Sequence, residues 1–136
     1  MKTWVINQKV VFRDATPMQI YKMYLTAKDH AKFTGSEVKI TDKVGAKFMA
    51  YDGYAQGENI ELVPGKKIVQ TWQAREAEWP AKHFSKLILK ISDHKDGAEL
   101  EMIHQGVPEQ YANSIAGGWK DYYWKPMQEM IDAKKK

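Results

Sequence analysis

Short strand-like segments separated by turn dipeptides, between residues 36 and 105, constrain the fold of this chain more than any other feature. The dipeptides Asp52-Gly53, Pro64-Gly65 and Asp96-Gly97 mark three of the turns. Asp-Gly is strongly favoured in two-residue hairpin loops, and Pro-Gly combines a fixed φ angle with a residue that tolerates positive φ. Segments joined by such turns pair in antiparallel fashion. Together with a first strand near the N-terminus, the pattern predicts about six to seven antiparallel strands.

The last two strand-like segments show which face of this sheet is buried. Small or apolar residues occupy every second position of both segments: Ser85, Leu87, Leu89, Ile91, Ala98, Leu100 and Met102. Lysine and glutamate fill most of the positions between them. Because successive side chains of a strand point to opposite faces, the pattern predicts one covered face and one mostly hydrated face.

Two short helices are predicted after the first strand, which covers residues 4–13. Thr16 can cap a helix, Pro17 suits its first position, and Gln19 completes a capping box. A second short helix is predicted over Asp29–Phe33, before the next glycine ends it.

One long amphipathic helix is predicted after Val107-Pro108. With Trp119 at the centre and a step of about 100° per residue, apolar and aromatic residues gather on one side: Ala112, Ile115, Ala116, Tyr122, Tyr123, Pro126 and Met130. Trp124 falls among the polar residues, so we expect it to be exposed or to lie at a subunit interface. Pro126 lacks a backbone donor and is expected to bend the helix.

This helix is the only long amphipathic element available to cover the sheet. The sequence therefore predicts an α+β fold in which a curved antiparallel sheet wraps around the C-terminal helix. A length of 136 residues without linker-like stretches predicts a single domain over residues 1–136.

Composition limits the function classes. The chain has no cysteine, which excludes disulfides, thiol catalysis and cysteine-ligated zinc. Without Lys134, Lys135 and Lys136, 18 basic residues face 17 acidic ones, so we expect no nucleic-acid partner and assign these lysines to a helix C-terminus. No signal peptide or membrane span is visible, so we expect a cytoplasmic protein without a membrane partner.

Several motifs resemble the C-terminal, START-like domain of the activators of heat-shock protein 90 ATPase. The similarity runs from about Phe12 to Ile131 and rests on the following residues: Phe33-Thr34-Gly35, Asp52-Gly53 with Gly57, Glu61-Leu62-Val63-Pro64, Ile68-Val69 with Trp72, Trp79-Pro80, and Gly118-Trp119 with Tyr122-Tyr123. The resemblance implies the START, or Bet v 1-like, helix-grip fold, often with a cavity between sheet and helix. In eukaryotic activators of this kind an additional N-terminal domain makes the main chaperone contacts, and we expect no counterpart of that domain within these 136 residues.

Few residues suggest chemistry. Four histidines lack the spacing of a helical metal site, and serines lack a nucleophile motif, so we expect no metal, no cofactor and no assignable reaction. His104 is in phase with inward-facing residues, and we favour a hydrogen-bonded core histidine over an acid-base role. If Ile60 faces inward, period two also turns Glu58 inward, which leaves a START-like cyclase, dehydratase or hydrolase as an alternative.

We expect non-enzymatic binding of a small, largely apolar molecule in a cavity beside Trp119, with a co-chaperone-like protein module as the other alternative. The candidate cavity residues are Phe48, Tyr54, Glu58, Ile60, Trp72, Leu87, Leu89, His104, Ile115, Trp119, Tyr122 and Tyr123. A binder predicts a cavity with few ionisable groups, and an enzyme predicts a convergent pair such as Glu58 with His104. A protein module predicts an exposed apolar patch, around Trp79 or Trp124. Either a monomer or a homodimer is compatible with the sequence.

Overall fold

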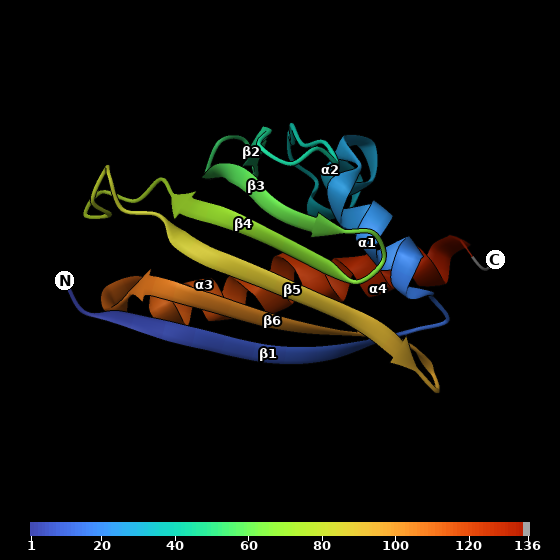
Figure 1. Cartoon of the computed structure of the whole chain (residues 1–136). Helices are drawn as coiled ribbons and strands as arrows, with labels where there is room; N and C mark the ends of the chain where they lie inside the picture. Colours follow the sequence, from blue (N-terminus) through green and yellow to red (C-terminus); the bar gives the residue numbers. More distant parts are fainter. Residues whose placement is uncertain (135–136) are drawn as a thin grey trace.

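A six-stranded antiparallel sheet curves around the C-terminal helical segment in the computed structural model, which describes residues 1–134 (Figure 1). The strand order is β1-β6-β5-β4-β3-β2, and each neighbouring pair is antiparallel. The strands are β1 (Thr3–Arg13), β2 (Lys47–Ala50), β3 (Ala55–Val63), β4 (Lys67–Ala74), β5 (Ser85–His94) and β6 (Gly97–Pro108). The predicted α+β helix-grip architecture is confirmed, and the role predicted for Lys135 and Lys136 lies outside the described residues.

The two short helices, α1 (Pro17–Leu25) and α2 (Ala27–Thr34), follow β1 as predicted. Gln19 N donates to Thr16 Oγ1 at 3.2 Å, and Thr16 N donates to the Gln19 side-chain oxygen at 2.7 Å. This reciprocal capping box satisfies two backbone donors of the first turn. Gly35, with φ of 70°, ends α2 in the left-handed conformation that favours glycine.

The inner face of the sheet forms the core together with the helices. All seven inward residues predicted from the alternation of β5 and β6 are buried. Met127, from the last helix, and Phe12, from β1, are likewise fully buried in the same hydrophobic cluster. The single amphipathic helix therefore covers the apolar face that the strand pattern predicted.

The C-terminal segment is helical throughout but changes its winding. It consists of η1 (Glu109–Tyr111), α3 (Ala112–Trp119), the π-helical turn η2 (Lys120–Trp124) and α4 (Lys125–Lys134). In the π turn, Lys125 N donates to the carbonyl of Lys120, five residues back. Pro126 follows at once, and it lacks the N–H that would continue the α-helical ladder. A π turn beside a proline redirects the helix and accommodates the missing bond.

The π turn reverses the predicted positions of two aromatic residues. It inserts one extra residue into the helix, so side chains beyond it rotate relative to an uninterrupted 3.6-residue pattern. Trp124 is buried, stacks on Trp119 at a centroid distance of 5.4 Å, and donates from Nε1 to Gln8 Oε1 at 2.7 Å. Tyr122, predicted on the inner stripe, is 53% exposed. The prediction of an exposed or interface Trp124 is wrong.

A bulge in β3 overturns the predicted orientation of Ile60 and Glu58. Asn59 pairs with Gln70 and Glu61 pairs with Val69. β3 therefore advances by two residues over a distance in which β4 advances by one. Ile60 is the extra residue and is 45% exposed. Before the bulge, Glu58 pairs with the exposed Lys47 on the outer face, opposite to the side of the buried Phe48.

Gly117 provides a stability test of the helix. It lies inside α3, and a methyl group added there would meet no atom within 4 Å. Glycine in a helix interior is less stable than alanine by about 0.5–1 kcal/mol. We expect Gly117→Ala to raise the free energy of unfolding by about that amount, measured by urea denaturation. A loss of stability would show that the space beside α3 is occupied.

Candidate functional site

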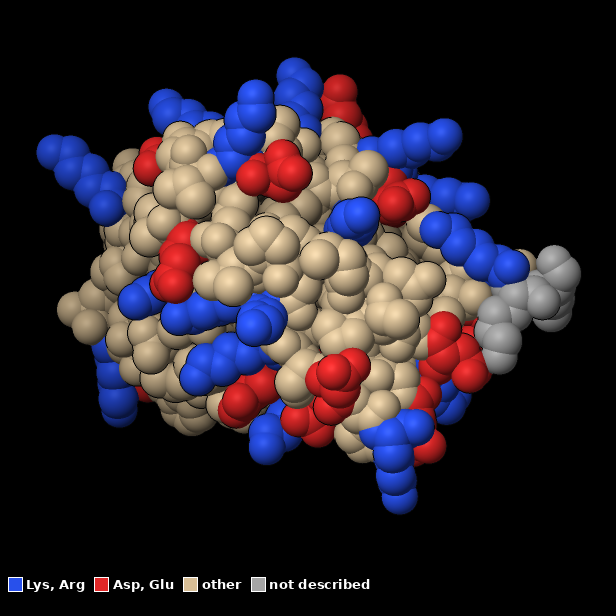
Figure 2. All heavy atoms as spheres, turned by 45° about the vertical axis from the view of Figure 1, so that its right-hand side comes forward, with Lys and Arg blue, Asp and Glu red and all other residues tan. Residues whose placement is uncertain are grey.

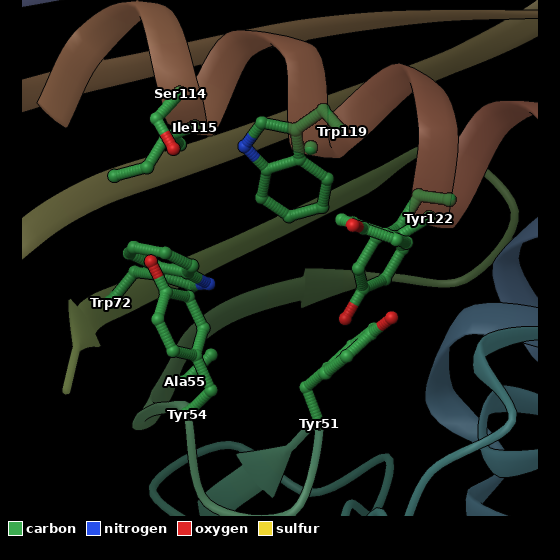
Figure 3. Close-up of a pocket in the computed structure, with 10 residues that line it drawn as sticks. Tyr51, Tyr54, Ala55, Trp72, Ser114, Ile115, Trp119 and Tyr122 are labelled. Atoms are coloured by element: carbon green, nitrogen blue, oxygen red, sulfur yellow. The ribbon is translucent and has the colours of Figure 1, made fainter.

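An open pocket of about 240 Å³ lies between the helical segment and the end of the sheet formed by β3 and β4 (Figure 3). The β2–β3 turn, β3 and β4 form one wall, and α3 with η2 forms the other. We call it the aromatic pocket, because six of its ten lining residues are aromatic and none carries a charge. It is lined by Tyr51, Tyr54, Ala55, Trp72, Ser114, Ile115, Gly118, Trp119, Tyr122 and Tyr123.

A chain of hydrogen bonds fixes Trp119 against the sheet. Trp119 Nε1 donates to His104 Nδ1 at 3.2 Å, so His104 carries its proton on Nε2. His104 Nε2 donates to Ser85 Oγ at 2.8 Å, and the Ser85 hydroxyl donates to the carbonyl of Trp72 at 2.8 Å. Burial lowers the pKa of His104 from 6.5 to about 3. His104 is therefore a neutral, fully hydrogen-bonded core histidine, the reading that the sequence favoured.

A second buried histidine fixes Tyr123. The Tyr123 hydroxyl donates to His30 Nε2 at 2.7 Å, and His30 Nδ1 donates to the Tyr24 carbonyl at 2.8 Å. Burial lowers the pKa of His30 to about 4, although the bond to the Tyr24 carbonyl acts in the opposite direction. Burial also raises the pKa of Tyr123. Both groups remain neutral at physiological pH, which suits their low-dielectric surroundings.

A buried polar network outside the pocket lining was not predicted from the sequence. The Tyr24 hydroxyl donates to Gln70 Oε1 at 2.9 Å, and Gln70 Nε2 donates to Asn59 Oδ1 at 2.8 Å. Asn59 Nδ2 then donates to the carbonyls of Thr41 at 2.9 Å and Lys43 at 3.0 Å. The network joins α1, β4, β3 and the segment before β2. Because its members satisfy one another, it holds these elements in one arrangement.

The rim of the pocket is also held in place. The Tyr54 hydroxyl donates to Glu76 Oε2 at 2.6 Å, and burial together with this bond raises the pKa of Tyr54. Tyr51, Asp52 and Gly53 have φ angles of 57°, 57° and 91°. Left-handed backbone is costly for residues with a Cβ and persists only where the surroundings enforce it. Here Asp52 Oδ1 accepts the backbone N–H of Glu37 at 2.7 Å.

The left-handed turn brings Tyr51 to the mouth of the pocket. Its ring lies 5.2 Å from the ring of Tyr122, at an interplanar angle of 61°. Tyr122 is exposed yet lines the pocket, so the π turn that moved it outward made it a rim residue. The rim thus joins the β2–β3 turn to the helix across the opening (Figure 3).

The structure divides the predicted cavity residues into three groups. Six line the aromatic pocket: Tyr54, Trp72, Ile115, Trp119, Tyr122 and Tyr123. Four are buried in the core outside its lining: Phe48, Leu87, Leu89 and His104. Glu58 and Ile60 point away from the pocket because of the β3 register described above. The convergent pair of Glu58 with His104, expected of an enzyme, is not brought together.

Sequence reasoning missed Tyr51, Ala55, Ser114 and Gly118 as lining residues. Tyr51 could have been found, because it precedes the Asp-Gly turn that was recognised. Gly118 could have been found too, because a helical residue without a side chain leaves room beside Trp119. Ala55 and Ser114 carry no such signal.

The external aromatic patch predicted for a protein module is not formed at Trp79 or Trp124, since each is only 6% exposed. Trp79 donates from Nε1 to the His83 carbonyl at 2.8 Å and stacks on Tyr111. Within residues 1–134, no three His, Asp or Glu side chains gather closely enough to hold a metal ion. No helix in the same range is long and apolar enough to cross a membrane.

Comparison with known proteins identifies the family. Residues 14–132 match the family described as "Activator of Hsp90 ATPase homolog 1-like protein". The chain belongs to this family. The match covers most of the chain and includes all ten residues that line the aromatic pocket.

Curated relatives carry the same description. The human "Activator of 90 kDa heat shock protein ATPase homolog 1" is 30% identical over 114 residues, which are 84% of this chain and 33% of the relative. The activator homolog of Dictyostelium discoideum is 33% identical over 106 residues, or 77% of this chain and 27% of the relative. The chain therefore spans about a third of the length of the curated relatives it matches.

Solved structures show the same fold. An HSP90 activator from Plasmodium falciparum superposes with a TM-score of 0.81 at 20% identity and covers 96% of both chains. The Aha1 dimer from Colwellia psychrerythraea gives a TM-score of 0.74 at 16% identity, covering 96% of this chain and 95% of that one. These likenesses show the helix-grip fold, whereas the oligomeric state of this chain stays a prediction.

Proposed function

We propose that this chain is a co-chaperone module that binds an ATPase of the Hsp90 class. The family match over residues 14–132 carries the proposal, since curated relatives of this family are named as activators of that ATPase. The sequence favoured binding of a small molecule, with a co-chaperone module as an alternative. The family match favours the alternative. Because the chain spans about a third of those relatives, the proposal concerns binding rather than full activation. A cytoplasmic location is part of the same proposal.

The outer face of the sheet supports the proposal with an apolar row across three strands. Ile103 on β6 pairs with Ile88 on β5, and Ile88 pairs with Val69 on β4. We call these three residues the outer row. Ile88 and Ile103 are half-buried, whereas Val69 is only 3% exposed and lies beneath the surface. The helical segment lies on the opposite side of the sheet (Figure 1). The row therefore lies on the face that the helices leave open, and Ile88 and Ile103 are its accessible members.

Charged residues border the outer row. Two residues further along the strands, Glu101 pairs with Lys90, and Lys90 pairs with Lys67. Figure 2 shows basic and acidic side chains interspersed over the surface on one side of the molecule, with uncharged areas between them. An apolar centre inside a charged rim is a typical composition for a protein-binding surface.

Calorimetric titration of the purified chain with the Hsp90-class ATPase of the same organism tests this function. We expect saturable binding, and we expect Ile88→Thr to weaken it about fivefold or more, as truncation of an interface anchor does. Val44→Thr is the matched control, because Val44 is 64% exposed and lies outside the sheet. Absence of binding by the folded wild-type chain would refute the function, and equal effects of both variants would exclude the outer row.

A second candidate function, binding of a small and largely apolar molecule, is favoured by the aromatic pocket. The pocket has rigid aromatic walls and hydroxyl groups at its rim, which is the usual composition of a ligand site. None of its lining residues is a histidine or a carboxylate, so the proposal is for binding rather than catalysis. Thermal-shift screening with hydrophobic metabolites should find compounds that raise the unfolding temperature. Failure of every compound, together with native mass spectra lacking a retained ligand, would exclude it.

A further inference from the structure

Trp72 differs from the other four tryptophans in its indole N–H. Each of the others donates from Nε1 to a protein acceptor: Trp4 to Glu109, Trp79 to the His83 carbonyl, Trp119 to His104, and Trp124 to Gln8. Trp72 is 5% exposed and makes edge contacts with the rings of Trp79 and His104. No acceptor for its Nε1 is present among residues 1–134.

The indole nitrogen of Trp72 faces the aromatic pocket. Figure 3 shows it directed toward the space between Trp119, Tyr51 and Tyr122. Every described side-chain nitrogen or oxygen that is sealed from solvent has a hydrogen-bond partner, so the unpartnered Trp72 Nε1 reaches the pocket space. A buried indole N–H normally has a partner, because its desolvation is otherwise not compensated. Here the acceptor comes from the pocket side, as water in the free protein or as a group of a bound molecule that replaces this water.

The lining restricts the chemistry of that partner. No lysine, arginine or histidine lines the pocket, so a carboxylate or phosphate would be desolvated without a counter-ion. A cation is disfavoured at the same point, because the indole N–H presents its positive edge. The partner is therefore an uncharged acceptor, and a carbonyl oxygen is the simplest group of this kind.

The shape and size restrict the rest of the molecule. Aromatic rings of Trp72, Trp119 and Tyr54 form much of the wall, and such surfaces pack well against a flat ring. An apolar cavity of about 150 Å³ is large enough to hold benzene. The aromatic pocket, at about 240 Å³, has room for a further ring.

We propose that the aromatic pocket binds a small, flat, uncharged molecule of one or two rings whose carbonyl oxygen accepts the hydrogen bond from Trp72 Nε1. The proposal rests on the second candidate function and is independent of chaperone binding. In this proposal Trp72 selects ligands that carry a hydrogen-bond acceptor. The other aromatic rings make apolar contacts with the ligand that do not depend on its polar groups.

A pair of probes separates the hydrogen bond from the apolar contacts. 1-Indanone and indane share the same fused rings and differ in the carbonyl group, and binding of both is followed by NMR titration. Trp72→Phe removes the N–H and keeps an aromatic ring. Both probes lose apolar contact with the smaller ring, and we expect indanone to lose about two- to tenfold more affinity than indane, as for loss of one hydrogen bond.

The wild-type chain gives an independent readout that needs no folded variant. The indole N–H resonance of Trp72, one of five tryptophan signals, should move downfield with indanone and much less with indane. Equal shifts and equal affinities for both probes would overturn the role of Trp72 while leaving ligand binding intact. If neither probe bound, the second candidate function and this inference would both fail.

A variant with a filled pocket tests whether the two probes bind in the aromatic pocket. Ala55 lines the pocket from the start of β3 and is 3% exposed, so Ala55→Leu places extra carbon atoms in or beside that space. We expect both probes to lose affinity in this variant, with the wild-type NMR spectrum retained away from the pocket. Unchanged binding of both probes would show that they bind elsewhere and would overturn the proposal.

Discussion

Lowering the pH from 7 to 5 is expected to reduce the free energy of unfolding by about 3–4 kcal/mol. The cause is the pair of buried histidines, since burial lowers the pKa of His30 to about 4 and that of His104 to about 3. In the unfolded chain both imidazoles take up a proton near pH 6.5, whereas the folded chain keeps both neutral. The unfolded state therefore binds more protons in this window, and stability falls as the pH falls.

Urea denaturation followed by tryptophan fluorescence at several pH values measures this effect. His104→Gln removes one of the two groups, so the fall between pH 7 and 5 should shrink to about 2 kcal/mol, whatever the variant loses at pH 7. His94→Gln is the control, because His94 lies at the β5–β6 turn outside the core, and it should retain the full fall. A wild-type fall smaller than about 1 kcal/mol would contradict buried neutral histidines.

Gly57→Ala is expected to destabilise the fold by about 3 kcal/mol. A Cβ at this position would overlap the backbone carbonyl of Thr71 on β4 and approach Phe48 Cε1 to 2.8 Å. Backbone atoms of a paired strand cannot yield as a flexible side chain can, so β3 and β4 would have to separate. These strands carry or adjoin Tyr54 and Trp72, and the variant should therefore also weaken binding in the aromatic pocket.

The free energy of unfolding in urea measures the effect, with Gly117→Ala as the matched control. The same chemical change is expected to stabilise the chain at Gly117, because no atom lies within 4 Å of the added methyl group. Opposite signs for the two variants would separate steric overlap from the general preference for alanine. A Gly57→Ala variant as stable as the wild type would mean that β3 and β4 are not packed this closely.

Local patterns predicted the fold because each depends on neighbours along the chain. The Thr16 capping box involves residues three apart, and the inner faces of β5 and β6 follow from strict alternation. Such signals survive folding unless a tertiary contact overrides them. They were sufficient for the strand number, the two short helices and the helix that the sheet surrounds.

The wrong side-chain orientations were predicted where one extra residue interrupts the regular spacing of a helix or a strand. Pro126 was identified as a bend, but its accommodation by a π turn, which buries Trp124 and exposes Tyr122, depends on the helix packing against the sheet. The bulge at Ile60 is set by the register between β3 and β4, which no property of β3 alone reveals. One inserted residue reverses inward and outward positions, so the candidate site was predicted less well than the fold.

Buried polar residues of the core were also not predicted from the sequence. Gln70 is completely buried on β4, between Ile68 and Trp72 on the inner face of the strand. Its partners Tyr24 and Asn59 lie far away in the sequence. Periodicity treats such a glutamine as a surface residue. Its role becomes visible only when three separate elements are placed together.

The most direct test of chaperone binding is NMR of the chain with isoleucine methyl groups labelled, recorded while the Hsp90-class ATPase of the same organism is added. Binding through the open face of the sheet predicts that the methyl signals of Ile88 and Ile103 shift or broaden first. The signal of Ile115, in the aromatic pocket, should change much less. Unchanged spectra at a saturating concentration of the ATPase, or changes confined to Ile115, would contradict chaperone binding through the outer row.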